Sequence, residues 1–386
     1  MNILFISYIY PELKSRCLTC HGTYSLHQFV QEWSKSQTII VIKPVVKYFN
    51  FCIRGKDYYI ENIKVRRINV YKIPKTLFFN SYNIINYLRN INIDFDVVIG
   101  HCGFSNIIAY QISNKFQIPF VVGLHQTDIN ILNSLVKAPY YKKIIRSSAG
   151  VVCRSPSIYN RLVKKMKHLK QPYFIANSGI EKNLIENFDF FLKKLYTWRR
   201  LNKLTFISCS KLLKLKNIDI NLKALSNLKN IEWQYYILGD GPERKKLENL
   251  SRKLEIDKNV KFLGHRISKE TLEFMKMADI FIMVSAPETF GLAYLEAMAK
   301  GCLIIGCEGW GIDGIIKNEI NGFLCKPRSV EGLYDTLHKI IFKYEQKELE
   351  LILEREYETI NNMLNSKLSM QYFSFINSIV KQYKYA

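Results

Sequence analysis

The sequence has no apolar run that approaches the roughly 20 consecutive residues that a membrane-spanning helix needs. Its first 14 residues, MNILFISYIYPELK, lack a basic stretch ahead of their apolar run, so they do not read as a secretory leader. With 48% hydrophobic and 23% charged residues among 386, the chain is neither disordered nor fibrous. We therefore expect a cytoplasmic protein of two ordinary domains.

Acidic residues are scarce in the first half of the chain. Residues 1–180 contain 7 Asp and Glu against 24 Lys and Arg, and so carry +17 of the formal net charge of +23. No acid lies between Asp128 and Glu181, where ten basic residues occur. This imbalance indicates a polyanionic partner, either nucleic acid or an anionic membrane, unless the whole composition has drifted basic.

The nine cysteines show no pairing pattern, and most lie in apolar runs, so we expect reduced core residues. Cys17, Cys20 and His21 match the spacing of c-type haem attachment. That chemistry needs export, for which no signal is visible, and a zinc site would need a second pair of ligands. We therefore interpret them as loop residues and expect neither a metal nor another cofactor.

Apolar runs typical of strands alternate with stretches of helical period, which indicates parallel sheets with crossover helices. The expected strands of the first half are residues 2–8, 38–43, 64–70, 96–101, 120–125, 150–155 and 173–178. Those of the second half are residues 204–210, 234–240, 260–264, 279–285 and 302–307. The near-continuous apolar character of the strands predicts α/β domains whose sheets are covered on both faces.

This rhythm divides the chain into domains. We expect a first doubly wound domain over 1–180, a connector over 181–202 and a second doubly wound domain over 203–365. The last part of the chain reads as two or three helices, of which 366–386 has aromatic residues at helical spacing. We expect this last helix to pack back towards the first domain.

Ligands of open parallel sheets bind beyond the carboxyl ends of the strands. One such loop carries Lys211 and Lys216, which could neutralise a phosphate. Another carries Glu288, followed by an Ala- and Leu-rich helix that ends at Gly301 and contains Glu296. The start of this helix could bind an anion, and two carboxylates beside it suit the hydroxyls of a nucleotide-sugar. Alternatively, Glu288 only caps the helix and Glu296 is a surface residue.

Several motifs occur in an order that resembles one family. Glu288 and Glu296 are separated by seven residues and followed by AMAKG, while SKLLKLKNID, YILGDGPERKKLE, NVKFLG, INGFLC and FIANSGI accompany them. These residues resemble the retaining glycosyltransferases of family four, or glycosyl transferases group one. The resemblance implies the GT-B fold, with two Rossmann-like domains facing a cleft, and transfer of a hexose-type sugar from a nucleotide-sugar to a glycan.

The same resemblance implies roles for residues in the second domain. Lys211 and Lys216 would bind the donor diphosphate, and Glu288 would bind hydroxyls of the donor sugar. The backbone amides that would assist at the diphosphate are those near Phe290, Gly291 and Leu292. Glu296 would bind the ribose, and the loop of Gly264, His265 and Arg266 would lie against the base.

In the first domain the resemblance places Gly22 near the sugar and diphosphate, and His125 opposite the reacting carbon. From the residues alone, His125 is more simply a histidine at a strand end. Three departures from the family pattern stand out. His21-Gly22 replaces a glycine pair, Ser210-Lys211 replaces Gly-Arg, and residues 309–314 replace Gly-Gly-Val-Pro-Glu. Lys in place of Arg keeps the charge and loses the bidentate fork, whereas the other two changes leave the donor sugar open.

Cleavage of the anomeric bond creates an oxocarbenium-like centre and places negative charge on the diphosphate. Lys211, Lys216 and the helix after Glu288 could stabilise that charge, so we expect no metal. Asp94 and Asp96 precede a strand, where we expect them to end a turn. Two alternatives stay open: a nucleotide-sugar epimerase of the same fold, which needs no acceptor, and a nucleic-acid-binding protein, for which no recognition motif is visible.

Residues 155–170 predict an amphipathic helix with Ser155 as its cap and Pro156 at its first position. Its apolar stripe is Ile158, Leu162, Val163, Met166 and Leu169, and its basic face is Arg161, Lys164, Lys165, Lys167 and Lys170. Together with residues 137–146, this helix predicts a basic surface over residues 137–170 that would bind the inner face of the cytoplasmic membrane. The acceptor would then be a lipid-linked glycan of surface-polysaccharide assembly. Alternatively, this is an ordinary crossover helix with a solvated basic face.

Overall fold

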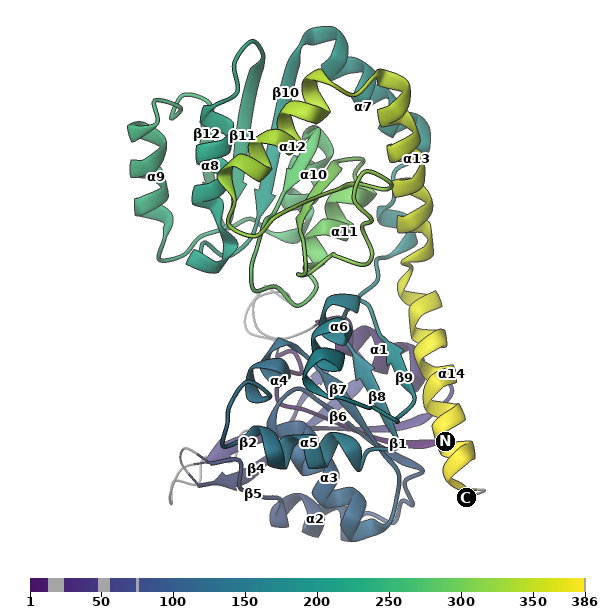
Figure 1. The fold of residues 1–386 in the computed structure, drawn as a ribbon. Helices are drawn as coiled ribbons and strands as arrows, with labels where there is room; N and C mark the ends of the chain where they lie inside the picture. The colour runs from purple at the N-terminus through teal and green to yellow at the C-terminus, as the bar shows by residue number, and fades with distance from the viewer. Residues whose placement is uncertain (13–23, 48–55, 74–75, 385–386) are drawn as a thin grey trace. The chain divides into compact units, whose positions relative to one another are not determined.

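The computed structural model describes residues 1–12, 24–47, 56–73 and 76–384, which form two compact units (Figure 1). Unit 1 consists of residues 1–178 together with 365–386, and unit 2 consists of residues 179–364. Each unit is an α/β layer structure with its own apolar core. The α/β class predicted from the sequence is confirmed.

The sheet of unit 1 has the strand order β3-β4-β2-β1-β6-β7-β8-β9, and β5 pairs with β4. Its strands are β1 (Asn2–Ser7), β2 (Thr38–Lys47), β3 (Tyr58–Ile60), β4 (Ile63–Lys72), β5 (Phe79–Asn80), β6 (Val97–His101), β7 (Phe120–Leu124), β8 (Gly150–Cys153) and β9 (Tyr173–Ile175). All pairs are parallel except β3–β4 and β4–β5. β6, β7 and β8 are entirely buried, as their continuous apolar sequence demands.

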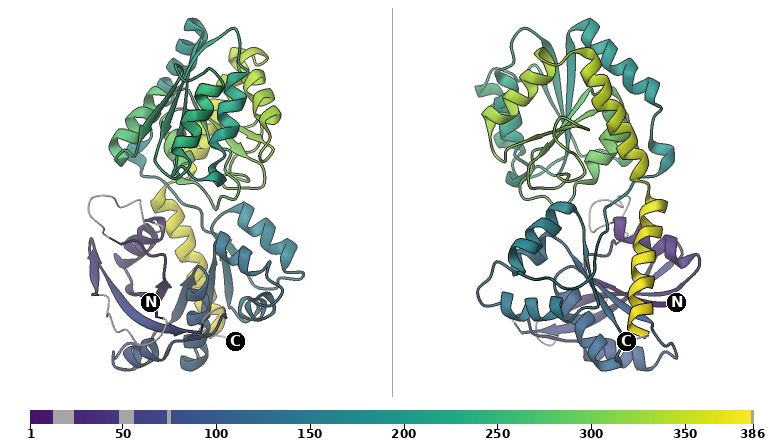
Figure 2. Two further views of the ribbon diagram at one scale, coloured as in Figure 1. Left: turned by 90° about the vertical axis from the view of Figure 1, so that its left-hand side faces the viewer. Right: turned by 45° about the vertical axis from the view of Figure 1, so that its right-hand side comes forward.

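The helices of unit 1 flank this sheet. They are α1 (Tyr24–Ser34), α2 (Tyr82–Arg89), α3 (Phe104–Phe116), α4 (Gln126–Ile131), α5 (Ala138–Arg146), α6 (Pro156–Lys165) and α14 (Asn365–Lys384). α14 lies against α1 (Figure 2), and the indole N–H of Trp33 donates to the carbonyl of Ser369 at 2.9 Å. The last helix of the chain therefore completes the unit that the first residues begin.

Unit 2 has an all-parallel sheet in the order β12-β11-β10-β13-β14-β15. Its strands are β10 (Lys203–Cys209), β11 (Glu232–Leu238), β12 (Val260–Gly264), β13 (Ile280–Ile282), β14 (Leu303–Cys307) and β15 (Phe323–Cys325). Its helices are α7 (Phe188–Leu201), α8 (Ile218–Ser226), α9 (Arg244–Lys253), α10 (Ser268–Met277), α11 (Leu292–Ala299), α12 (Val330–Phe342) and α13 (Gln346–Asn362). The strand order reverses between β10 and β13, and such a reversal opens a binding crevice at the carboxyl ends of those strands.

Two local features differ from the sequence interpretation. Residues 181–202 contain α7, whose buried Phe191, Leu195 and Trp198 join the core of unit 2, so this segment is more than a connector. The helix expected over 155–170 ends at Lys165, because the backbone leaves the helical conformation at Met166, which has a φ of −116° and a ψ of 79°. Its cap is as predicted: the Ser155 hydroxyl accepts the N–H of Ile158.

Candidate functional site

The loops that follow β10 and β13 meet where the strand order of unit 2 reverses. The Ala286 N–H donates to the carbonyl of Leu215 at 3.0 Å, and the Asn217 side-chain amide donates to the carbonyl of Val284 at 2.7 Å. Asn217 has a φ of 53° and stands at the start of α8. Sequence reasoning did not single out Asn217, although an Asn directly ahead of a helix is a recognisable cap signal.

Lys216 and Glu288, one from each loop, form an ion pair with Nζ 2.5 Å from Oε2. Both side chains are mostly shielded from water, with 17% and 14% of their area exposed. A pair held in such surroundings is less screened than one on an open surface. The structure thus joins two residues, 72 positions apart in sequence, that the motifs had predicted for one site.

The segment from Glu288 to Leu292 is shaped by glycine. Gly291 precedes α11 with a φ of 85°, and a Cβ there would lie 2.6 Å from the ring of Tyr294. The N–H of Gly311 donates to the carbonyl of Glu288 at 3.2 Å. Phe290 is buried, and Leu292 is the first residue of α11. The first amides of this helix therefore lie directly after the Glu288 loop, the position where a helix can hold an anion.

Glu296 projects from α11 and is half-buried, and burial raises the pKa of its carboxyl. Both Glu296 and Lys216 act electrostatically on the Cys209 thiol at the end of β10, whose pKa burial raises to about 12. Glu296 thus belongs to the same neighbourhood as Lys216. It is not the plain surface residue of the alternative interpretation.

The loop of Lys211 packs against the turn that follows β11. The N–H of Leu212 donates to the carbonyl of Asp240 at 2.9 Å, and a Cβ on Gly239 would lie 1.8 Å from the carbonyl oxygen of Ser210. Only glycine permits this approach, which gives the Gly-Asp-Gly-Pro motif a steric meaning. The side chain of Lys211 is exposed on this loop.

Gly264 at the end of β12 joins the same edge of the sheet. Its carbonyl accepts the N–H of Gly239 at 2.8 Å, and its φ is 69°. Arg266 lies two residues further on and is exposed. The predicted donor residues of unit 2 therefore follow three of its strands, β10, β12 and β13, at their shared carboxyl edge.

His125 belongs to unit 1, where it follows β7 and precedes α4. It is buried, and its backbone N–H donates to Asp128 Oδ2 at 2.7 Å. Its Nε2 lies 3.2 Å from Nδ1 of His101 at the end of β6. Sequence reasoning missed His101, although two strands each ending in histidine were a visible signal. Gly22, Cys17, Cys20 and His21 lie outside the described residues.

Asp94 and Asp96 lie at the opposite edge of the unit 1 sheet from His125. Asp96 accepts the N–H of Asn2 at 2.8 Å and Nζ of Lys384 at 2.7 Å, and the carbonyl of Asp94 accepts the Asn2 side chain. These contacts tie the start of β1 to the residues before β6 and to α14. Within residues 1–12, 24–47, 56–73 and 76–384, no group of three or more His, Cys, Asp or Glu is arranged to hold a metal ion.

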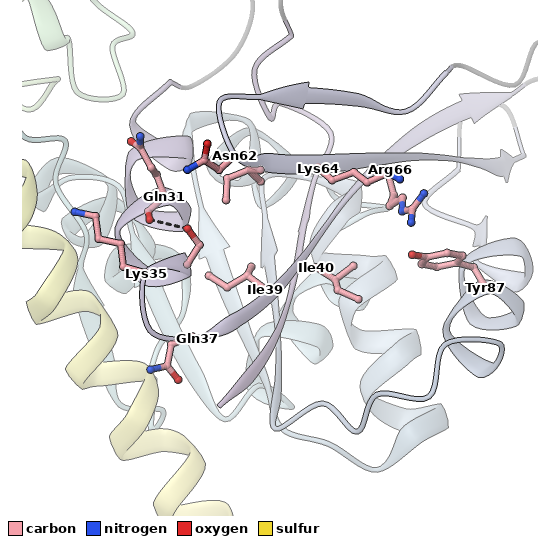
Figure 3. Close-up of a pocket in the computed structure, with 11 residues that line it drawn as sticks. Gln31, Lys35, Gln37, Ile39, Ile40, Asn62, Lys64, Arg66 and Tyr87 are labelled. Carbon is pink, nitrogen blue, oxygen red and sulfur yellow. Dashed lines mark hydrogen bonds between the residues drawn. The ribbon is translucent and has the colours of Figure 1, made fainter.

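Two hollows of unit 1 lie elsewhere. One, of about 510 Å³, extends over β2 and β4 from Lys35 to Tyr87 (Figure 3). The other, of about 900 Å³, shares Arg66 and Tyr87 with it and also contacts Asn69. Neither is lined by a residue of the predicted site.

Comparison with known families gives the arrangement its context. The model of glycosyl transferases group 1 matches residues 198–352, and that of glycosyltransferase family 4 matches residues 45–181. The chain belongs to glycosyltransferase family 4. The family predicted from the sequence motifs is thereby confirmed, and the chain is a glycosyltransferase.

Individual relatives are distant but extend over most of the chain. The N-acetyl-alpha-D-glucosaminyl L-malate synthase of Bacillus anthracis is 25% identical over 343 residues, 85% of this chain and 86% of that protein. The alpha-monoglucosyldiacylglycerol synthase of Streptococcus pneumoniae is 26% identical over 247 residues, 59% of this chain and 55% of that one. The crystal structure of Anabaena HepE with UDP and glucose aligns with a TM-score of 0.70 at 16% identity, covering 98% of this chain and all of HepE. This likeness confirms the GT-B fold.

Proposed function

We propose that this glycosyltransferase moves a hexose-type sugar from a nucleotide-sugar to a glycan acceptor with retention of anomeric configuration. The observation that carries the proposal is the Lys216–Glu288 pair beside the start of α11, at the strand-order reversal of unit 2. A cation and helix amides suit a leaving diphosphate, and a carboxylate beside them suits sugar hydroxyls.

The roles of the remaining residues follow from their places. Lys211 extends the positive charge along the same loop, and Glu296 on α11 would accept hydrogen bonds from the hydroxyls of the ribose. Arg266 and Gly264 lie at the end of β12, where a base could rest. HepE was crystallised with UDP and glucose, which makes a uridine nucleotide the first donor to test.

The donor is tested by thermal shift with UDP-, GDP- and ADP-sugars, since a ligand that binds only the folded protein raises its melting temperature. One donor class should stabilise the wild type and fail to stabilise Glu288→Gln. Transfer is then measured with and without added acceptor glycan. Turnover that needs no acceptor would support the epimerase in place of the transferase.

We also propose that the enzyme acts on a lipid-linked acceptor at an anionic membrane face. In the part of the chain that the structure describes, no helix is long and apolar enough to cross a bilayer. Leu135 and Val136, between α4 and α5, are 95% and 88% exposed. Exposed lysines and arginines lie near them in sequence: Lys143, Arg146, Lys164, Lys165, Lys167 and Lys170. An apolar tip and several cations are the two signals that peripheral binding needs.

The structure corrects the predicted helix at two residues, Arg161 of its basic face and Val163 of its apolar stripe. The Arg161 guanidinium is half-buried, donating from Nη1 to Gln126 Oε1 at 2.6 Å and from Nε to the Ser157 carbonyl at 3.0 Å. It is therefore engaged within unit 1. Val163, by contrast, is 42% exposed and does not belong to the buried stripe.

Liposome flotation tests the membrane proposal. The wild type should float with anionic vesicles and not with neutral ones. Glu at Lys164, Lys165 and Lys167, or Asp at Leu135 and Val136, should reduce the floated fraction. Glu at Lys245, Lys246 and Lys253 of α9, also exposed, is the charge-matched control and should leave flotation intact. Equal recovery of the wild type with both vesicle types would contradict the proposal.

A further inference from the structure

The two hollows of unit 1 adjoin each other, and together they form one groove, which we call the β4 groove. Both are lined by Arg66 of β4 and Tyr87 of α2. Their volumes of about 510 and 900 Å³ fall within the range of small-molecule pockets, roughly 300–1,000 Å³. All residues that line them belong to unit 1. A ligand in the β4 groove would therefore leave the predicted site of unit 2 free.

The groove opens where two neighbouring strands diverge. β2 and β4 pair with each other from Val41 and Val65 onward. Ahead of these residues β2 pairs with β1, and Ile63 of β4 pairs with β3. Ile39 and Ile40 of β2 line the space between the two strands (Figure 3) and are only partly buried. The sheet itself thus supplies a preformed hollow with apolar side chains at its base.

Amide side chains dominate the larger hollow. Four asparagines line it, namely Asn69 of β4, Asn83 and Asn86 of α2, and Asn90 at the end of that helix. Each amide offers two N–H donors and a carbonyl acceptor. The Asn83 side chain donates to the backbone carbonyl of Asn69 at 3.1 Å, a bond that joins α2 to β4 beside the hollow. Such a lining suits a ligand rich in hydroxyls, because a hydroxyl both donates and accepts.

An arginine held by a carboxylate stands where the two hollows adjoin. Arg66 donates from Nη1 to Asp57 Oδ2 at 2.6 Å, and Asp57 Oδ1 accepts the backbone N–H of Arg67 at 3.1 Å. The Arg66 guanidinium lies over the ring of Tyr87, 5.7 Å from its centroid (Figure 3). The side chains of Arg66 and Asp57 stay 33% and 34% exposed, so a ligand can reach both. A donor and an acceptor therefore stand side by side near an aromatic ring, which suits the neighbouring hydroxyls and the apolar face of a sugar.

The cations of the groove are poor contacts for a phosphate chain. Three of them stand beside carboxylates, in the pairs Arg66–Asp57, Arg67–Glu12 and Lys35–Glu32. Lys56 and Lys64, both exposed, complete the basic residues of the lining. The carboxylates offset the positive charge on which affinity for nucleic acid depends, and Arg66 lies over Tyr87, on which a base would stack. The lining therefore favours an uncharged chain of hydroxyls over a nucleic acid.

We propose that the β4 groove is a glycan-binding site, separate from the site of transfer, which holds a chain of uncharged sugars through its amides and the Arg66–Asp57 pair. A glycosyltransferase meets such chains as acceptors or products. The bound glycan would then be an acceptor or product that the enzyme retains between rounds of transfer. This interpretation of the glycan rests on the proposed function, whereas the binding itself does not.

Binding is tested with the full chain on a printed array of neutral and acidic oligosaccharides. The wild type should bind neutral oligosaccharides of several residues, and equilibrium titration with the strongest of them gives a Kd. Tyr71 and Asn86 line the larger hollow and are exposed, so Tyr71→Ala with Asn86→Ala should fold. This double variant should raise the Kd about tenfold, the value of two hydrogen bonds. A wild type that binds no oligosaccharide of the array would overturn the proposal.

Asn114→Ala with Tyr383→Ala is the matched control, because both residues are exposed on helices of unit 1, α3 and α14, and line neither hollow. It should leave the Kd unchanged. Raising the salt from about 50 to 200 mM should also change the Kd little, because contacts with hydroxyls release no counterions.

Two results would contradict the assignment. An equal loss of affinity in the control would show that the groove is not the site. Affinity that falls steeply with salt and extends to single-stranded RNA would identify a polyanion site in its place. Glycan binding by a protein that transfers no sugar would keep the site and refute only the proposed function.

Discussion

The two units contribute functional groups of opposite electrostatic character. In unit 2 the predicted site is built from compensated or solvated charges: Lys216 is paired with Glu288, and Lys211 is exposed. In unit 1 the groups around His125 are buried, and the cation among them, Arg154, donates to the hydroxyls of Ser25 and Ser178. The comparison therefore separates two kinds of charge: one that is paired with a carboxylate or solvated in unit 2, and one that is buried among neutral groups in unit 1.

The largest expected effect comes from substitutions in the predicted site of unit 2. Lys216→Ala and Glu288→Gln should each lower the transfer rate by about 10²–10³, the usual cost of losing one charge-stabilising contact. Lys203→Ala is the control, because its pair with Glu232 is open to solvent at 3.8 Å and such pairs contribute little. Steady-state rates at matched folded fraction measure the difference. Wild-type rates in both site variants would refute the assignment.

The next effect concerns the glycines at the two sheet edges. Gly239→Ala in unit 2 and Gly123→Ala in unit 1 both create close contacts, with the Ser210 carbonyl and the His101 ring. Overpacking of this kind costs about 1–3 kcal/mol of unfolding free energy. Denaturant titration should show a loss of unfolding free energy in both variants. Only Gly123→Ala should also change the ¹⁵N NMR signal of the His101 ring. Gly332→Ala, within helix α12 and closest to the Ser329 side chain, is the milder control.

A smaller effect sharpens the unit 1 half. Arg154→Met removes a buried cation that is paired with no carboxylate among the described residues, so its unfolding free energy at pH 8 should equal or exceed that of the wild type. Because folding lowers the pKa of His101 and His125, the unfolded chain binds more protons, and stability falls as the pH drops below about 6.5. The variant should lose less stability on this acidic side.

Burial acts on Asp128 in the opposite sense, since it raises that pKa to about 6. Its contribution to stability therefore declines as the pH rises through this range. For this reason we compare the unfolding free energies of the wild type and Arg154→Met, each from urea titrations at pH 5 and pH 8. An identical pH dependence in the two proteins would show that Arg154 does not influence the histidines.

The smallest expected effect is that of a metal chelator on the transfer rate. If lysines and helix amides stabilise the leaving diphosphate, EDTA should leave the transfer rate nearly unchanged. Loss of activity with recovery on adding Mg²⁺ or Mn²⁺ would contradict this expectation. Asp96→Asn then asks whether its carboxylate, which binds Asn2 and Lys384, is involved.

The fold was accessible from the sequence because long apolar strands alternate with helical periods. β3, β5 and β15, of two or three residues, were not predicted, whereas β9 and β13, also of three residues, were, because each of these two lies within a longer strand-like run of the sequence. In the site, the motifs predicted that Lys216 and Glu288 lie at one edge of the sheet, since both follow strands in the sequence, whereas their ion pair was not predicted. The hydrogen bonds of His101 with His125 and Tyr372 could not be predicted, because Tyr372 lies 271 positions after His101 and reaches it through the packing of a helix. Periodicity shows that a helix face is buried and does not show against what.

The return of α14 to unit 1 has a consequence for biosynthesis. Unit 2 is continuous in sequence, so it can fold as soon as residue 364 has left the ribosome. Unit 1 is begun first but receives α14 only after the whole of unit 2 has been made, and until then Trp33 and Phe29 lack their partner Tyr372. The nascent chain must therefore carry an incomplete apolar surface throughout the synthesis of unit 2, and a ribosome that stalls late releases a protein with one finished half.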